Sequence, residues 1–259
     1  MTLDALPFVN WIFWAALGSG SLLVLGGTEL LGGTTRGYRL FMAGMLVVVA
    51  AILLLSELNL APGTVADETA DTRRLLVWAA AGLTLAYLVA SVADWPRSGL
   101  AVAAGLAGVA AMTALATAGG SWSAPLFTAQ MVLTALALGA VSDAMLLGHW
   151  YLVTPQLSPT PLRRMMWLLV AVLALQVLVF VIAVTAISSG PLDGPIGWVT
   201  WLRLGVGLLA PIVISVLAIL ASRAASLQAS TGLLYIALAF VMAGSIAGAS
   251  ITYLTGVPV

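Results

Sequence analysis

The sequence predicts an all-α integral membrane protein with eight transmembrane helices. Of its 259 residues, 62% are hydrophobic and only 7% are charged, whereas a soluble domain of this size needs a larger polar surface. The apolar residues fall into eight long runs, and short segments between the runs carry most of the charges. A run of about 18 apolar residues or more crosses the hydrocarbon core as a helix, because in lipid the backbone must satisfy its own hydrogen bonds.

The expected helices span residues 8–32, 39–60, 75–94, 99–118, 126–152, 165–188, 196–222 and 230–255. Lysine is absent, so arginine alone reports the topology. The loops after the odd-numbered helices hold six arginines, namely Arg36, Arg39, Arg97, Arg163, Arg164 and Arg223. Cytoplasmic loops are enriched in basic residues. Both termini are therefore expected outside, in a multi-pass protein of the inner (cytoplasmic) membrane that contacts the lipid bilayer.

A weak internal repeat indicates how the helices are grouped. The segment Ala16-Leu17-Gly18-x-x-Ser21 in the first helix matches Ala137-Leu138-Gly139-x-x-Ser142 in the fifth. Four helices return the chain to the same side of the membrane, so the repeat predicts two parallel four-helix bundles, residues 1–122 and 123–259. Small residues at helical spacing, among them Gly244 and Gly248, indicate close helix packing.

The composition excludes several functions. The formal net charge is zero, so the chain has no basic field to hold nucleic acid. There is no cysteine and only one histidine, His149. A haem held by two histidines of one chain and an iron–sulfur cluster are therefore not expected here, and neither is a metal site.

Two ionisable residues lie at membrane depth near the outer boundary. Arg203 falls about two turns below the outer end of the seventh helix, and Glu57 falls about one turn from the outer end of the second. Charges at this depth are costly, so each is a functional candidate that needs a partner. The sequence predicts that Glu57 pairs with Arg203. The pair either lines an outward cavity, with a catalytic role, or is a structural bridge between helices.

Three further ionisable residues are candidates for proton handling on the inner side: Glu29, Asp143 and His149. Asp143 and His149 are six residues apart on one helix, which separates them by roughly 120° around its axis. They are expected to face different neighbours. Glu29 is expected to face Asp143, Arg36 or Arg39. His149 either anchors the helix at the interface or handles protons.

The first helical hairpin resembles a known family. Its features are Pro7-x-x-Asn10-Trp11-Ile12, then Leu17-Gly18-Ser19-Gly20-Ser21, an acid at Glu29, and a second helix that ends Ser56-Glu57-Leu58-Asn59-Leu60-Ala61-Pro62. These residues resemble the opening of the NrfD/PsrC/DmsC-type membrane anchors. In that family the second helix typically ends in Asp-Leu-Gly-x-Pro; this chain keeps the acid, the leucine and the proline, but lacks the glycine and has one residue more.

The resemblance implies a quinone-reactive subunit of an oxidoreductase complex, with eight core helices and an iron–sulfur partner subunit, alongside other membrane subunits. It implies a menaquinone- or ubiquinone-type headgroup near Asn10, Trp14, Glu57 and Arg203. An amide, a flat aromatic ring and a buried carboxylate supply the hydrogen bonds, stacking and proton route that a quinone needs.

Two other functions remain open from the sequence. The intramembrane acids are also typical of a proton-coupled transporter of small solutes or ions, although the repeat is parallel and no helix is plainly broken at mid-membrane. A structural or assembly subunit without a site of its own is the third alternative.

Overall fold

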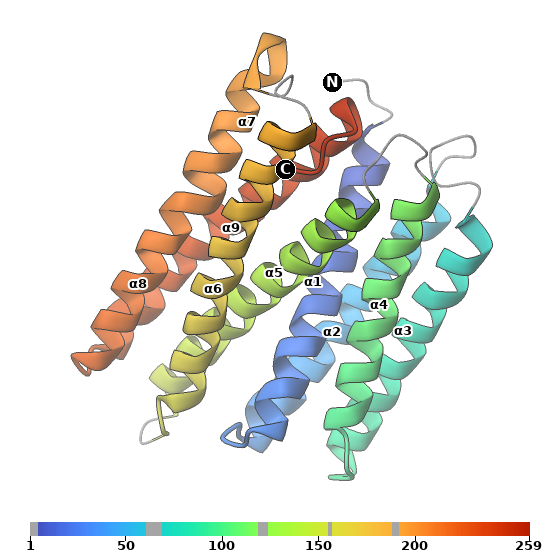
Figure 1. Ribbon diagram of the computed structural model, residues 1–259. Helices are drawn as coiled ribbons and strands as arrows, with labels where there is room; N and C mark the ends of the chain where they lie inside the picture. The colour runs from blue at the N-terminus through green and yellow to red at the C-terminus, as the bar shows by residue number, and fades with distance from the viewer. Residues whose placement is uncertain (1–4, 61–68, 119–123, 155–156, 188–191) are drawn as a thin grey trace.

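The computed structural model describes residues 5–60, 69–118, 124–154, 157–187 and 192–259. Over these residues all regular structure is helical (Figure 1). Eight of the described segments are long and apolar enough to cross a membrane. The prediction of an all-helical membrane protein with eight spans is therefore confirmed.

The helices, in chain order, are α1 (Ala5–Leu30), α2 (Arg36–Leu58), α3 (Ala70–Val92), α4 (Ser98–Ala118), α5 (Ala124–Val153), α6 (Thr160–Ile182), α7 (Gly197–Leu204), α8 (Ala210–Arg223) and α9 (Leu227–Thr255). A π-helical turn, η2 (Ala183–Ile187), extends α6. A 3₁₀ turn, η4 (Gly194–Ile196), leads into α7, and a second π-helical turn, η5 (Gly205–Leu209), joins α7 to α8. The seventh predicted helix is thus α7, η5 and α8 in succession.

Most predicted boundaries differ from the observed ones by a few residues, and the largest differences lie at the starts of α3 and α6. Both helices begin five residues before the predicted start. Their first turns are polar, so hydropathy alone assigns them to loops, but Asp71 at the N-terminus of α3 favours helix through the helix dipole. Pro161 suits the first turn of α6. As a result, Arg73 is part of α3 and not of a loop.

The π-helical turn η5 has an identifiable cause. Pro211, in the first turn of α8, has no N–H to donate to the carbonyl of Gly207 one turn earlier. The helix accommodates this missing bond by widening over Gly205–Leu209. The widened turn begins two residues after Arg203.

Helices α1 and α5 form the centre of the molecule. Helix α1 packs against α2, α4, α5 and α9, and α5 also packs against α4, α6 and α9. The two central helices meet at Gly20 and Gly139, where the backbones touch, so a methyl group on either glycine would overlap the other helix. Such close approach is typical of small residues in membrane helices.

The peripheral helices present large apolar side chains outward. Leu55, Leu75 and Val213 are examples on α2, α3 and α8, and a bilayer is the environment in which such surface is stable. Helix α1 begins and α9 ends at the same end of the molecule, the upper end in Figure 1. We call this the terminal end. The opposite end carries the α1–α2 and α3–α4 connections.

Candidate functional site

Glu57 has an arginine partner, but it is Arg73 and not Arg203. The Nη2 atom of Arg73 donates to Oε1 of Glu57 at 2.9 Å, and its Nε donates to Oε2 at 3.0 Å. Both side chains are only 2% exposed. The exposed Arg74 lies farther off, with its Nε 3.7 Å from Oε1. The predicted pairing of Glu57 with Arg203 is therefore wrong.

The helix arrangement explains this correction. Helix α2 packs against its hairpin neighbour α3 and against α1, whereas α7 packs against α9. Arg73 lies in the first turn of α3, at the same end as Glu57, and it is held from a third helix as well, because its guanidinium lies 5.8 Å from the ring centre of Trp11 in α1. This ion pair joins α2 to α3 below the terminal end.

Arg203 lies in a groove on α9. The side chain is 1% exposed. Its Nη1 lies 3.0 Å from where a Cβ on Gly244 would be placed, and its Nε lies 3.1 Å from the equivalent point on Gly248. Within the described part of the chain, Nε and Nη2 have no hydrogen-bond partner. The two glycines of α9 thus make room for a buried cation, a role that their spacing alone does not reveal.

Asn10 and Trp14 form a hydrogen-bonded chain with Ser56 at the terminal end. The amide nitrogen Nδ2 of Asn10 donates to Oγ of Ser56 at 2.8 Å, and Nε1 of Trp14 donates to Oδ1 of Asn10 at 3.0 Å. The Ser56 hydroxyl in turn donates to the carbonyl of Ile52. The indole and the serine therefore fix the orientation of the amide.

An open crevice of about 570 Å³ lies over this chain, between the first turns of α1 and the last turns of α2. It is lined by Leu6, Pro7, Asn10, Ser56 and Asn59. Its walls combine apolar side chains with the amides of Asn10 and Asn59 and the hydroxyl of Ser56. The Asn10 amide keeps a second N–H and a further lone pair. Among the described residues, the lining includes neither Glu57 nor Arg203. The crevice can hold a small flat headgroup that accepts and donates hydrogen bonds.

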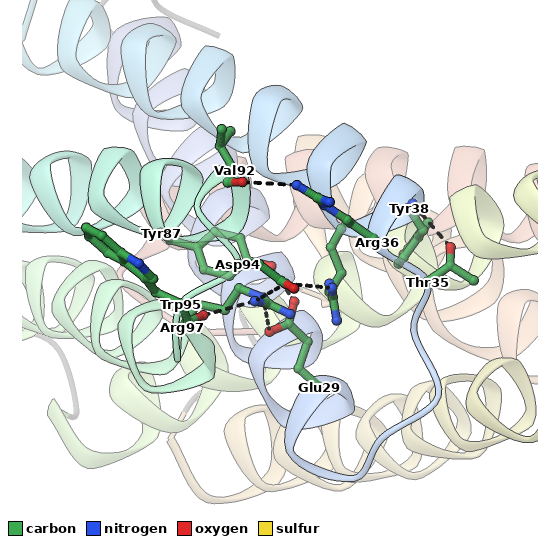
Figure 2. Close-up of polar contacts among 10 residues, drawn as sticks. Glu29, Thr35, Arg36, Tyr38, Tyr87, Val92, Asp94, Trp95 and Arg97 are labelled. Atoms are coloured by element: carbon green, nitrogen blue, oxygen red, sulfur yellow. Dashed lines mark hydrogen bonds and ion pairs between the residues drawn. The ribbon is translucent and has the colours of Figure 1, made fainter.

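A second polar cluster lies at the opposite end (Figure 2). The Tyr87 hydroxyl donates to Oε1 of Glu29 at 2.7 Å, and Nε of Arg97 lies 3.6 Å from Oε2. Asp94 bridges two arginines, with its Oδ1 3.0 Å from Nη1 of Arg97 and 3.6 Å from Nη2 of Arg39. The direct partners of Glu29 are therefore Tyr87 and Arg97, which the sequence did not predict. Of the expected neighbours, Arg39 lines the same cavity as Glu29.

The turn between α3 and α4 brings this cluster together. Asp94 lies two residues after the end of α3 and adopts the left-handed conformation, with φ at 58°, which aspartate tolerates better than most residues. The turn places Asp94 and Arg97 against the last turn of α1, where Glu29 lies. Arg36 at the start of α2 donates to the carbonyl of Val92 at 3.1 Å and holds the same turn from the other side (Figure 2).

Asp143 and His149 face different surroundings, as the sequence predicts. Asp143 is fully buried in α5. The Ser21 side chain of α1 interacts with its carboxyl, but over the residues that the structure describes neither carboxylate oxygen has a partner with hydrogen-bond geometry. His149 is exposed, and its Nδ1 lies 3.4 Å from the hydroxyl of Tyr235 on α9.

The sequence interpretation missed Arg73, Tyr87, Asp94 and Arg97. Arg73 lies in the first turn of α3, and Asp94 and Arg97 lie in the connection between α3 and α4. Helices that follow one another in the chain are usually neighbours in space. That rule favours Arg73 as the partner of Glu57. No comparable signal exists for Tyr87, which is one aromatic residue in an apolar run.

Fold and composition together define a polytopic helical membrane protein. Comparison of the chain with protein-family models, with curated protein sequences and with solved structures found no match. Among the described residues, no group of three or more metal-ligating side chains is placed to hold a metal ion.

Proposed function

We propose that this chain is an integral membrane subunit of an electron-transfer complex and that it binds a quinone headgroup in the crevice between α1 and α2. One observation carries the proposal. The exposed Asn10 amide is held by Trp14 and Ser56, and it lines an open crevice beside the apolar side chains of Leu6 and Pro7. Ligand sites of this kind combine mostly apolar walls with a few fixed polar groups.

In this proposal some residues bind the quinone headgroup and others orient the binding residue. The free N–H of Asn10 donates to a quinone carbonyl, and its Oδ1 accepts from a quinol hydroxyl. Trp14 orients the Asn10 amide, because its indole N–H donates a hydrogen bond to Oδ1 of Asn10. The ion pair of Glu57 and Arg73 holds α3 against α2 beside this site. Arg203 belongs to the packing of α7 on α9 and takes no part in binding in this proposal.

The proposal includes an arrangement of the chain. Residues 1–122 and 123–259 form two parallel four-helix bundles, and both termini face outward from the cytoplasmic membrane, in keeping with the six arginines at the opposite end. The crevice then opens at the outer face. Since the sequence has no cysteine, an iron–sulfur partner subunit would dock there and exchange electrons with the quinone, which is of the menaquinone or ubiquinone type.

Replacing Asn10 by leucine is expected to lower the quinone content of the purified protein about 10-fold, because one hydrogen-bond partner of the headgroup is lost. The measurement is solvent extraction of detergent-purified protein, followed by chromatographic quantification of quinone per chain. Thr185→Val is the matched control, since it removes an exposed hydroxyl on η2, away from the crevice. A wild-type protein that carries no quinone and co-purifies with no iron–sulfur subunit would overturn the proposal.

One observation favours proton-coupled transport as a second candidate function. Asp143 is buried where α5 packs against α1, and its carboxylate oxygens lack hydrogen-bond partners among the described residues. Ionisable groups at membrane depth are costly to bury, and they are typical of proton routes in transporters. Solute uptake into proteoliposomes that is driven by a proton gradient and abolished by Asp143→Asn would favour this candidate over the quinone site.

A further inference from the structure

A groove of about 290 Å³ lies between α1 and α6, in the half of the molecule opposite the quinone crevice. Both helices pack against α5, and α6 begins at the end of the molecule where α1 ends, the lower end in Figure 1. The apolar walls of the groove include Leu23 and Val24 of α1, Leu136 of α5 and Leu168 of α6. Among the described residues, Arg164 at the start of α6 is the only charged residue of the lining.

The charge of Arg164 is not compensated. Its side chain is exposed, and among the described residues it forms no ion pair. Its Nη1 donates to the carbonyl of Leu31, the residue after the end of α1, but at 3.5 Å this hydrogen bond is long. Arg164 therefore keeps most of its donors for a ligand at the mouth of the groove.

Two further arginines lie near Arg164, and over the part of the chain that the structure describes neither has a carboxylate partner. Arg163 donates to the hydroxyl of Ser222 at 3.1 Å and to its carbonyl at 2.8 Å. The guanidinium of Arg223 lies 5.9 Å from the ring centre of Trp167. The start of α6 is thus a cluster of positive charge.

The acidic residues of the chain do not balance this cluster. Glu29 of α1 has its direct partners in Tyr87 and Arg97, and it does not line the groove. Asp143 of α5 is fully buried. After Asp143 the sequence holds one more acid, Asp193, which precedes η4 and α7 at the terminal end. An anion at the mouth of the groove therefore meets positive charge that the protein itself leaves unpaired.

We propose that the groove between α1 and α6 binds one anionic phospholipid, of the phosphatidylglycerol type. The phosphate accepts hydrogen bonds from Arg164, whose planar guanidinium suits phosphate oxygens. One acyl chain lies along the groove against Leu23, Leu136 and Leu168. The uncompensated arginine is the reason to assign an anionic lipid, because basic pockets between transmembrane helices bind anionic headgroups and a zwitterionic lipid would bring a second positive charge to the same place.

Native mass spectrometry of the full chain in detergent tests the proposal, with titration of short-chain phosphatidylglycerol, phosphatidylcholine and inorganic phosphate. We expect one phosphatidylglycerol to bind at least about 5-fold more tightly than phosphatidylcholine, and Arg164→Gln to lose most of that preference. Arg74→Gln is the matched control, because it removes an exposed arginine at the terminal end. Equal affinities of the wild-type protein for the two lipids would overturn the proposal, as would an unchanged preference in Arg164→Gln.

A second variant tests the groove with Arg164 in place. Gly27 lines the groove, and no atom lies within 4 Å of the point where its Cβ would be, so Gly27→Leu fills the groove without displacing packed atoms. We expect this variant to weaken phosphatidylglycerol binding several-fold. Gly232→Leu is the control, since Gly232 of α9 is exposed and equally free of neighbours. Binding unaffected by Gly27→Leu, or full displacement of the lipid by inorganic phosphate, would overturn the proposal, since the groove would then play no part.

Discussion

The variant Glu57→Gln is expected to destabilise the folded protein by about 3–5 kcal/mol, the usual cost of leaving one member of a buried ion pair uncompensated. Arg73 would stay buried between α2, α3 and Trp11 with its charge unpaired. The glutamine keeps the shape of the side chain, so the loss reports the charge and not the packing. The measurement is the unfolding midpoint in a mixed-micelle denaturation series, followed by circular dichroism.

A double-mutant cycle separates the observed pair from the one that the sequence predicted. Glu57→Gln combined with Arg73→Gln is expected to cost clearly less than the sum of the two single variants, with a coupling energy of about 1–3 kcal/mol. Glu57→Gln combined with Arg203→Gln is expected to be additive within about 0.5 kcal/mol, because the two residues share no partner among those that the structure describes. Arg74→Gln is the control, since an exposed arginine in an ion pair contributes about 1 kcal/mol or less. Stronger coupling of Glu57 to Arg203 than to Arg73 would contradict the structure.

Gly139→Ala is expected to destabilise the protein by about 3 kcal/mol, at the upper end of the range for overpacked sites. The added methyl group would overlap the backbone of Gly20 and the amide nitrogen of Ser21. Backbone atoms cannot move aside as a flexible side chain can, so α1 and α5 would have to separate along their length. The same denaturation series measures the effect.

Gly44→Ala in α2 serves as the matched control for this variant. No atom lies within 4 Å of the point where its Cβ would be, and alanine favours a helix over glycine by up to about 1 kcal/mol. The control is therefore expected to be neutral or slightly stabilising. Equal losses in Gly139→Ala and Gly44→Ala would show that α1 and α5 do not approach each other at Gly139.

The number of helices could be predicted from the sequence because an apolar run long enough to cross the bilayer must form a helix in lipid. The starts of α3 and α6 could not, since their first turns are polar and a hydropathy pattern assigns such turns to loops. This boundary error had a consequence for the site. With residues 70–74 assigned to a loop, Arg73 was no candidate partner for an acid in the second helix.

In the candidate sites, contacts within one helix could be predicted from sequence spacing, whereas contacts between helices could not. Asn10 and Trp14 are one turn apart, so their spacing places both on one face of α1, and the structure joins them by a hydrogen bond. The partner of Glu57 depends on which helices are neighbours, and depth in the membrane does not specify that. The contact between Tyr87 and Glu29 joins two residues that are 58 positions apart in sequence, and nothing local to either residue indicates it.

Photolabelling with an azido-substituted quinone is the most direct test of a quinone site between α1 and α2, because it reports where the headgroup lies. The purified protein is illuminated with the probe, digested, and the labelled residues are identified by mass spectrometry. We expect label on the first turns of α1 around Leu6 to Asn10 and on the last turn of α2 around Ser56 to Asn59, with labelling reduced in Asn10→Leu. Label concentrated at the opposite end, around Glu29 and Arg97, would contradict it.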